Sequence, residues 1–170
     1  MNREEIVTAL TALGAELHDQ GIAGEMYVVG GAAISLAFDA QRSTRDVDAV
    51  FEPKTAVYAA AASVAERFDL APDWLNDAVK GFLAGDDPEA VPVLEIPGLR
   101  CLVASPRMLL ALKVRAHRRG HDEDDIRLLA QELGLVKADD VLKIAEDAFG
   151  DRLDPAAQFL VQELFGGDSA

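Results

Sequence analysis

The fold of this chain is decided by the stretch MYVVGGAAISLAFDAQRSTRDVDAVF, residues 26–51. It begins with four apolar residues, Met26–Val29, which predict a short strand that ends at Gly30-Gly31. The small and apolar residues of 32–38 predict a helix directly after the glycines. Polar and apolar residues alternate over 46–51, which predicts a second strand. This order indicates a small sheet with helices packed against it.

The rest of the chain adds helices and a hairpin. Expected helices cover about 3–20, 53–68, 73–83, 107–117, 122–133, 138–149 and 154–165, and the expected hairpin joins 91–96 to 99–104. Ser105-Pro106 and Asp154-Pro155 each place a capping residue before a proline, which is typical of helix starts. The sequence therefore predicts an α+β protein with one domain over residues 1–170. A small mixed sheet flanked by helices occupies about 21–104, and a helical C-terminal part occupies 105–170.

Length and composition set the broad class. The chain has 170 residues, 50% of them hydrophobic, and a formal net charge of -14, which together indicate one globular domain. Its one cysteine excludes an internal disulfide and a cysteine-based zinc site. No apolar run reaches the roughly 18 residues that a membrane helix needs. The acidic N-terminus is unlike a signal peptide, so we expect a cytoplasmic protein without a membrane-bound part.

Positive charge is concentrated in one segment. Between Ile96 and His121 there is no acidic residue, but there are six cations: Arg100, Arg107, Lys113, Arg115, Arg118 and Arg119. An acidic protein does not coat nucleic acid nonspecifically, because such binding depends on cations that release counterions. A single basic segment fits a confined polyanion instead, such as a triphosphate or one end of an RNA. The alternative is a solvated basic helix that pairs with its acidic neighbours.

The residues with the clearest chemistry lie between the glycines and the second strand. Asp46 and Asp48 are two apart in a strand, so both side chains leave on one face, about 6.6 Å apart along it. Mg²⁺ suits such a pair, because it takes one or two carboxylates together with water and phosphate oxygens. At Gly30-Gly31 the backbone can approach a phosphate, and Thr44 and Arg45 add a hydroxyl and a cation. Either motif alone is more simply a turn or a solvated strand edge.

Two series of residues match a known pattern. The first is Tyr27-Val28-Val29-Gly30-Gly31-Ala32-Ala33 followed by Arg42-x-Thr44-Arg45-Asp46-Val47-Asp48. The second is Ser105-Pro106-x-x-Leu109-Leu110-Ala111-Leu112-Lys113 followed by Arg118 and Asp122-x-x-Asp125-Ile126. Together they resemble the nucleotidyltransferase superfamily of the polymerase-β type. Within it they are similar to small bacterial AbiE- and MenT-like toxins of toxin–antitoxin systems. The resemblance spans about residues 25–134.

This resemblance implies an enzyme that transfers NMP from an NTP to a hydroxyl acceptor with Mg²⁺ as cofactor. The acceptor would be a tRNA or a protein, and an antitoxin would be a further partner. The implied roles are metal binding by Asp46 and Asp48, triphosphate binding by Gly30, Gly31, Thr44, Arg45 and Lys113, and holding of that lysine or orientation of the acceptor by Asp125.

Other interpretations stay open at this point. Many members of the superfamily carry a third carboxylate on a neighbouring strand, and the candidate here is Glu95, which is otherwise an exposed strand residue. Asn76 is a candidate for lining the nucleotide cleft, with packing as the alternative. A relative without catalysis would be a nucleotide- or partner-binding module. An antibiotic-modifying nucleotidyltransferase is a third possibility.

Overall fold

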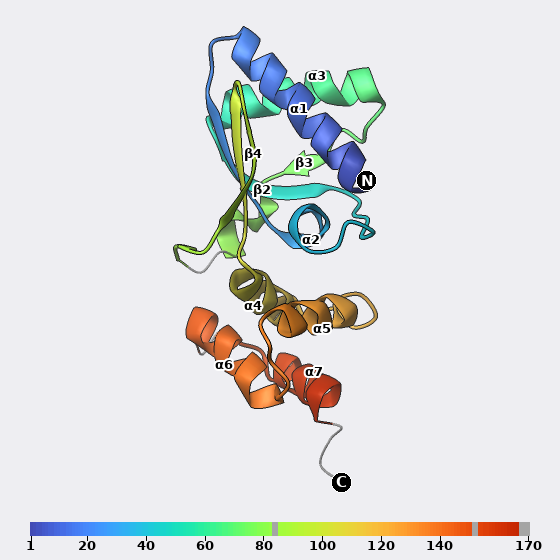
Figure 1. Ribbon diagram of the computed structural model, residues 1–170, viewed down its shortest axis with the longest axis vertical. Helices are drawn as coiled ribbons and strands as arrows, with labels where there is room; N and C mark the ends of the chain where they lie inside the picture. The colour runs from blue at the N-terminus through green and yellow to red at the C-terminus, as the bar shows by residue number, and fades with distance from the viewer. Residues whose placement is uncertain (83–84, 151–152, 167–170) are drawn as a thin grey trace. The chain divides into compact units, whose positions relative to one another are not determined.

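The computed structural model describes residues 1–82, 85–150 and 153–166 of the chain. It confirms the predicted α+β class (Figure 1). The chain divides into two compact units. Unit 1 contains Met1–Gly81 and Glu89–Ala104, and unit 2 contains residues 82–88 and the helices from Ser105 onward. Within the described ranges, every helix is too short or too polar to cross a membrane.

Unit 1 is built on a mixed sheet with the strand order β3-β2-β1-β5-β4. The strands are β1 (Gly24–Val28), β2 (Val47–Glu52), β3 (Leu75–Asn76), β4 (Val91–Ile96) and β5 (Leu99–Val103). β1 pairs antiparallel with β2 and parallel with β5, so it lies in the middle of the sheet. β3 pairs parallel with β2 at one edge, and β4 forms the predicted hairpin with β5 at the other.

The core of unit 1 lies on one face of this sheet. The helices of the unit are α1 (Arg3–Asp19), α2 (Gly30–Ala37) and α3 (Lys54–Phe68), and a 3-10 helix, η1, covers Ala78–Phe82. α1 packs on α3 and both contact the sheet (Figure 1). On β2, the side chains of Val47, Ala49 and Phe51 are buried in this core, as their alternation predicts. Asp48 and Val50 therefore lie on the opposite face of the sheet, half-buried.

The expected helix over 73–83 is wrong. Leu75 and Asn76 pair with Val47 and Asp48 as β3, and only Ala78–Phe82 is helical, while residue 83 lies outside the described residues. The Val47 N–H donates to the Trp74 carbonyl at 2.6 Å, which ties this segment to the edge of the sheet. Strand pairing has overridden the local preference, because a β conformation depends on the neighbouring strand more than on the residues themselves.

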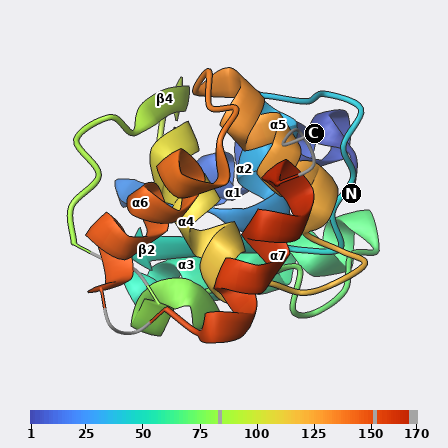
Figure 2. The ribbon, with the colours of Figure 1, turned by 90° about the horizontal axis from the view of Figure 1, so that it is seen from below.

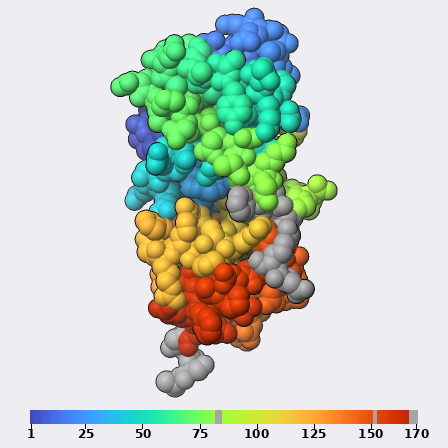
Figure 3. Space-filling view, turned by 180° about the vertical axis from the view of Figure 1, so that it is seen from behind, coloured from blue at the N-terminus to red at the C-terminus, as the bar shows by residue number. Residues whose placement is uncertain are grey.

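The described residues of unit 2 form four α-helices, α4 (Pro106–Ala116), α5 (Glu123–Glu132), α6 (Ala138–Phe149) and α7 (Pro155–Phe165). Both predicted caps are present: the Ser105 hydroxyl accepts from the Met108 N–H, and the Asp154 carboxylate accepts from the Ala156 N–H. α4 packs against α5 and α6, and α6 packs against α7 (Figure 2). One side of α7, red in Figure 3, forms part of the protein surface.

Candidate active site

The turn between β1 and α2 lies directly against the chain around β2. Gly30 has a φ of 64°, and a Cβ on it would be 3.1 Å from Asp48 Oδ2. A Cβ on Gly31 would be 2.9 Å from Thr44 Oγ1. The Val29 N–H donates to the Asp48 carbonyl at 2.9 Å, which holds the two segments together. The structure thus brings together four of the residues that the sequence singles out, and a side chain at either glycine would crowd the facing side chain of Asp48 or Thr44.

Asp46 and Asp48 are both half-buried, but only Asp48 belongs to β2 because the strand begins at Val47. Asn76 lies beside Asp48 in the parallel register of β3, and its Nδ2 donates to Asp46 Oδ2 at 3.3 Å. The Ala78 N–H donates to Asn76 Oδ1 at 3.2 Å, so the amide nitrogen is the atom that faces Asp46. Asn76 therefore fixes one carboxylate of the pair, a contact that the sequence did not reveal.

We refer to Gly30, Gly31, Thr44, Asp46, Asp48 and Asn76 as the glycine–carboxylate cluster. Arg45 does not belong to it as the structure stands: its side chain is largely exposed and its guanidinium lies 3.8 Å from Asp73. The oxygen ligands that the cluster offers are two carboxylates and the Thr44 hydroxyl, which suit a hard cation such as Mg²⁺. Within residues 1–82, 85–150 and 153–166 no three His, Cys, Asp or Glu side chains converge. A bound ion would complete its coordination with water or substrate oxygens.

Glu95 lies far from this cluster. β1 and β5 separate its strand, β4, from β2. In the sheet register, Glu95 is opposite Arg100, Arg100 is opposite Glu25, and Glu25 is opposite Glu52. Glu52 and Asp48 lie four residues apart along β2. With about 4.8 Å between strands and about 3.3 Å between residues, Glu95 and Asp48 are roughly 20 Å apart. Glu95 is thus an exposed residue of an edge strand, the alternative interpretation of the sequence.

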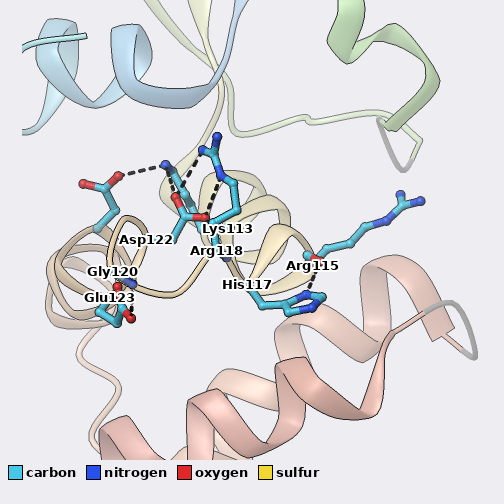
Figure 4. Close-up of polar contacts among 8 residues, drawn as sticks. Lys113, Arg115, His117, Arg118, Gly120, Asp122 and Glu123 are labelled. Carbon is cyan, nitrogen blue, oxygen red and sulfur yellow. Dashed lines mark hydrogen bonds and ion pairs between the residues drawn. The ribbon is translucent and has the colours of Figure 1, made fainter. Parts of the chain in front are cut away.

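In unit 2, Lys113 of α4 is buried between two carboxylates from the start of α5. Its Nζ lies 2.7 Å from Asp122 Oδ1 and 2.8 Å from Asp125 Oδ2. The exposed fractions of the Lys113, Asp122 and Asp125 side chains are 8%, 1% and 3%. Burial alone would raise the pKa of Asp122, but hydrogen bonds from Arg118 and Lys113 outweigh it and hold that pKa below its usual value (Figure 4). The contact that the resemblance implied between Asp125 and the lysine is present.

Arg100 is an exposed residue of β5, and the four other cations of the basic segment have partners within unit 2. They are Arg107 with Asp147 at 3.4 Å, Arg118 with Asp122 at 3.1 Å, Arg119 with Glu163 at 3.0 Å, and Arg115, whose guanidinium is 4.6 Å from the centre of the Phe149 ring. We refer to Lys113, Arg118, Asp122 and Asp125 as the lysine–aspartate cluster. Two cations and two carboxylates balance in it. The basic segment is therefore not a bare cationic surface.

Comparison with known proteins adds no family to this description. No protein-family model, curated protein or solved structure matches the chain. The roles of both clusters must therefore be inferred from their chemistry.

Proposed function

We propose that the protein is a Mg²⁺-dependent nucleotidyltransferase that transfers NMP from an NTP to a hydroxyl acceptor. The observation that carries this proposal is the close approach of the Gly30-Gly31 turn to Asp48, with Asp46 beside it. A nucleoside triphosphate needs backbone N–H groups for its phosphate oxygens and carboxylates for the cation that accompanies them. The glycine–carboxylate cluster supplies both in one place.

The start of α2 is suited to phosphate. The first N–H groups of a helix have no acceptor within it, and the residue before α2, Val29, offers no side-chain oxygen to cap them. Gly30 and Gly31 add no side chain there, which lets the Asp48 carboxylate and the Thr44 hydroxyl lie close to this helix start. The partial positive charge of the helix start favours an anion in the same position.

Asp46 and Asp48 are the residues that would hold the metal ion. Both are half-buried carboxylates, and Asn76 restrains the rotation of Asp46 through its amide nitrogen. When bound, Mg²⁺ offsets the negative charge of the phosphate oxygens during displacement of the leaving pyrophosphate. Asn76 and the backbone of the turn hold their groups in place before substrate arrives, which lowers the cost of ordering the site.

The remaining residues have supporting roles in this proposal. Thr44 contributes its hydroxyl beside Gly31, and Arg45 contributes a cation from the surface. Within unit 2, Asp125 holds the ammonium group of Lys113. We propose a tRNA or a protein hydroxyl as acceptor, cytoplasmic activity as a toxin, and an antitoxin as binding partner.

A second candidate function is a nucleotide- or partner-binding module without catalysis. One observation favours it: the ammonium group of Lys113 is buried and already shared by Asp122 and Asp125. An ammonium held in this way has less of its charge to offer a phosphate.

Incubation with Mg²⁺, each labelled NTP in turn and total tRNA tests the proposal. We expect the wild type to transfer label, and Asp48→Asn to reduce transfer to background because it removes a carboxylate charge without changing side-chain size. Glu95→Gln is the matched control, since it removes a carboxylate of the same sheet far from the site, and we expect it to transfer normally. Circular dichroism checks that each variant is folded.

The outcomes separate the two candidates. Label on RNA or on protein identifies the acceptor. Normal transfer by Asp48→Asn would exclude the proposed site. Nucleotide binding without transfer, unchanged by Asp48→Asn, would favour the binding module.

A further inference from the structure

The segment of unit 1 that carries Asn76 has little strand pairing of its own. β3 contains only Leu75 and Asn76 and lies at one edge of the sheet (Figure 1). Strands usually have about three to ten residues, so backbone pairing fixes this one weakly. The next residue, Asp77, is held by side chains of α3: the Lys54 ammonium group contacts Oδ2, and the Tyr58 hydroxyl donates to Oδ1 at 2.7 Å. We refer to these three residues as the Asp77 cluster.

The two donors of the Asp77 cluster are themselves held in place. Lys54 and Tyr58 are four residues apart on α3, so their side chains share one face of the helix. The Tyr58 ring packs edge-on against the ring of Phe51, with 5.0 Å between the centroids, and only 1% of Phe51 is exposed. Each donor engages a different oxygen of Asp77, which restrains rotation of the carboxylate. The hydrogen bonds, that from Lys54 above all, also hold the pKa of Asp77 below its usual value, so this carboxylate is ionised at neutral pH.

Asp77 lies between the two groups that orient the Asn76 amide. On one side is Asn76 itself, whose Nδ2 donates to Asp46 Oδ2 at 3.3 Å. On the other side is Ala78, whose N–H donates to Asn76 Oδ1 at 3.2 Å. The hydrogen bond to Asp46 is longer than most N–H···O bonds, so a small displacement of this backbone would break it. Anchoring Asp77 to α3 therefore anchors the Asn76 amide as well.

We propose that Asp77, held by Lys54 and Tyr58, is a positioning residue for the metal-binding carboxylates. It keeps the Asn76 amide directed at Asp46, so this carboxylate has one orientation before a divalent cation binds. Partners that orient a metal ligand commonly contribute about 10–100-fold to metal affinity. The inference rests on the proposed function, which takes the carboxylate pair as the metal ligands. Every residue that it uses belongs to unit 1.

The test measures the dissociation constant of Mn²⁺, a paramagnetic substitute for Mg²⁺, by electron paramagnetic resonance on the full chain without nucleotide. Tyr58→Phe removes the hydroxyl but keeps the ring on Phe51, and Asp77→Asn removes the charge at constant size. We expect each to weaken Mn²⁺ binding about threefold or more, and Asn76→Ala, which removes the orienting amide, about tenfold or more. Asp77→Asn should cause no further loss in Asn76→Ala, because residues that act through one another are not additive.

Glu16→Gln is the matched control. Glu16 also pairs with a cation of α3, Arg67 at 3.4 Å, and 29% of its side chain is exposed against 19% for Asp77. We expect this variant to bind Mn²⁺ within about twofold of the wild type. Asp48→Asn should abolish the measured binding, which identifies the site in a chain that has 30 acidic residues. Thermal unfolding of each variant verifies the fold.

Wild-type affinity in both Tyr58→Phe and Asp77→Asn would overturn the inference. Additive losses in the double variant would overturn it as well, because a merely structural effect of Asp77 does not depend on Asn76. Equal losses in Glu16→Gln, Mn²⁺ binding that survives Asp48→Asn, or a wild type that binds no Mn²⁺ would also contradict it. The proposed function fails differently: the wild type would bind Mn²⁺, with Asp77 required, but would transfer no label from any NTP.

Discussion

Replacing Lys113 with methionine should destabilise unit 2 strongly. The substitution keeps the length and apolar stem of the side chain but removes the ammonium group that Asp122 and Asp125 share. Asp122 keeps Arg118 as a partner, whereas Asp125 loses the ammonium group that lies 2.8 Å from it. Breaking a buried ion pair on one side costs about 3–5 kcal/mol, because a buried charge is left uncompensated. For a chain of this size we expect the melting temperature to fall by about 10 °C.

The measurement is denaturant unfolding followed by far-UV circular dichroism, with Lys143→Met as matched control. Lys143 also lies on a helix and pairs with a carboxylate, Asp147 at 3.7 Å, but both side chains are largely exposed. We expect its replacement to change the free energy of unfolding by about 0.5 kcal/mol or less. If Lys113→Met unfolds as the control does, the buried carboxylates do not need the lysine and our account of the cluster is wrong. The result also decides how a loss of activity in Lys113 variants should be interpreted.

Two further predictions concern pH and backbone geometry. The pKa of Asp122 is lower in the folded protein, so its carboxylate stabilises the fold above about pH 4 and this stabilisation is lost as the pH falls through the folded pKa. Asp122→Asn should therefore flatten the acid limb of the unfolding free energy measured against pH; parallel limbs for the two proteins would contradict the assignment. Gly98 and Gly120 have nearly equal φ values, 81° and 77°, but a Cβ at Gly98 would lie 2.1 Å from the Gly14 carbonyl oxygen, whereas Gly120 has open space. Gly98→Ala should cost about 1–3 kcal/mol more than Gly120→Ala in denaturant unfolding, and equal costs would rule out the close contact as the reason for glycine.

The sequence predicted those parts of the fold that local signals determine. The helix starts at Ser105-Pro106 and Asp154-Pro155 were confirmed because capping depends on a few adjacent residues. The hairpin of β4 and β5 was also confirmed, because its turn depends on the adjacent residues Pro97 and Gly98. The segment 73–83 was mispredicted because Leu75-Asn76 takes its conformation from pairing with β2, a partner that lies far away in the sequence.

The candidate site also has features that the sequence predicted and features that it did not. The approach of Gly30-Gly31 to Asp48 depends on a strand and a turn, which the sequence indicated, and on the antiparallel pairing of β1 with β2, which it did not. The hydrogen bond from Asn76 to Asp46 depends on the parallel placement of β3, and alternation within a strand does not predict which strands become neighbours. The sequence also does not specify the order of the strands, so it could not decide whether Glu95 lies near the carboxylate pair. Burial of Lys113 between two carboxylates depends on how α4 packs against α5, which the apolar spacing of either helix does not specify.

The path of the chain between its two units has a consequence for evolution. The chain passes from one unit to the other after Gly81, after Pro88 and after Ala104. Asp87, in the first segment that belongs to unit 2, contacts the start of α4. Its carboxylate accepts a hydrogen bond from the Ser105 N–H at 2.7 Å. A single recombination event at Ser105 would give the helices a new N-terminal neighbour but leave Asp87 behind, and one after Gly81 would separate β4 and β5 from their sheet. Exchange between related genes should therefore preserve the whole chain more often than either unit alone.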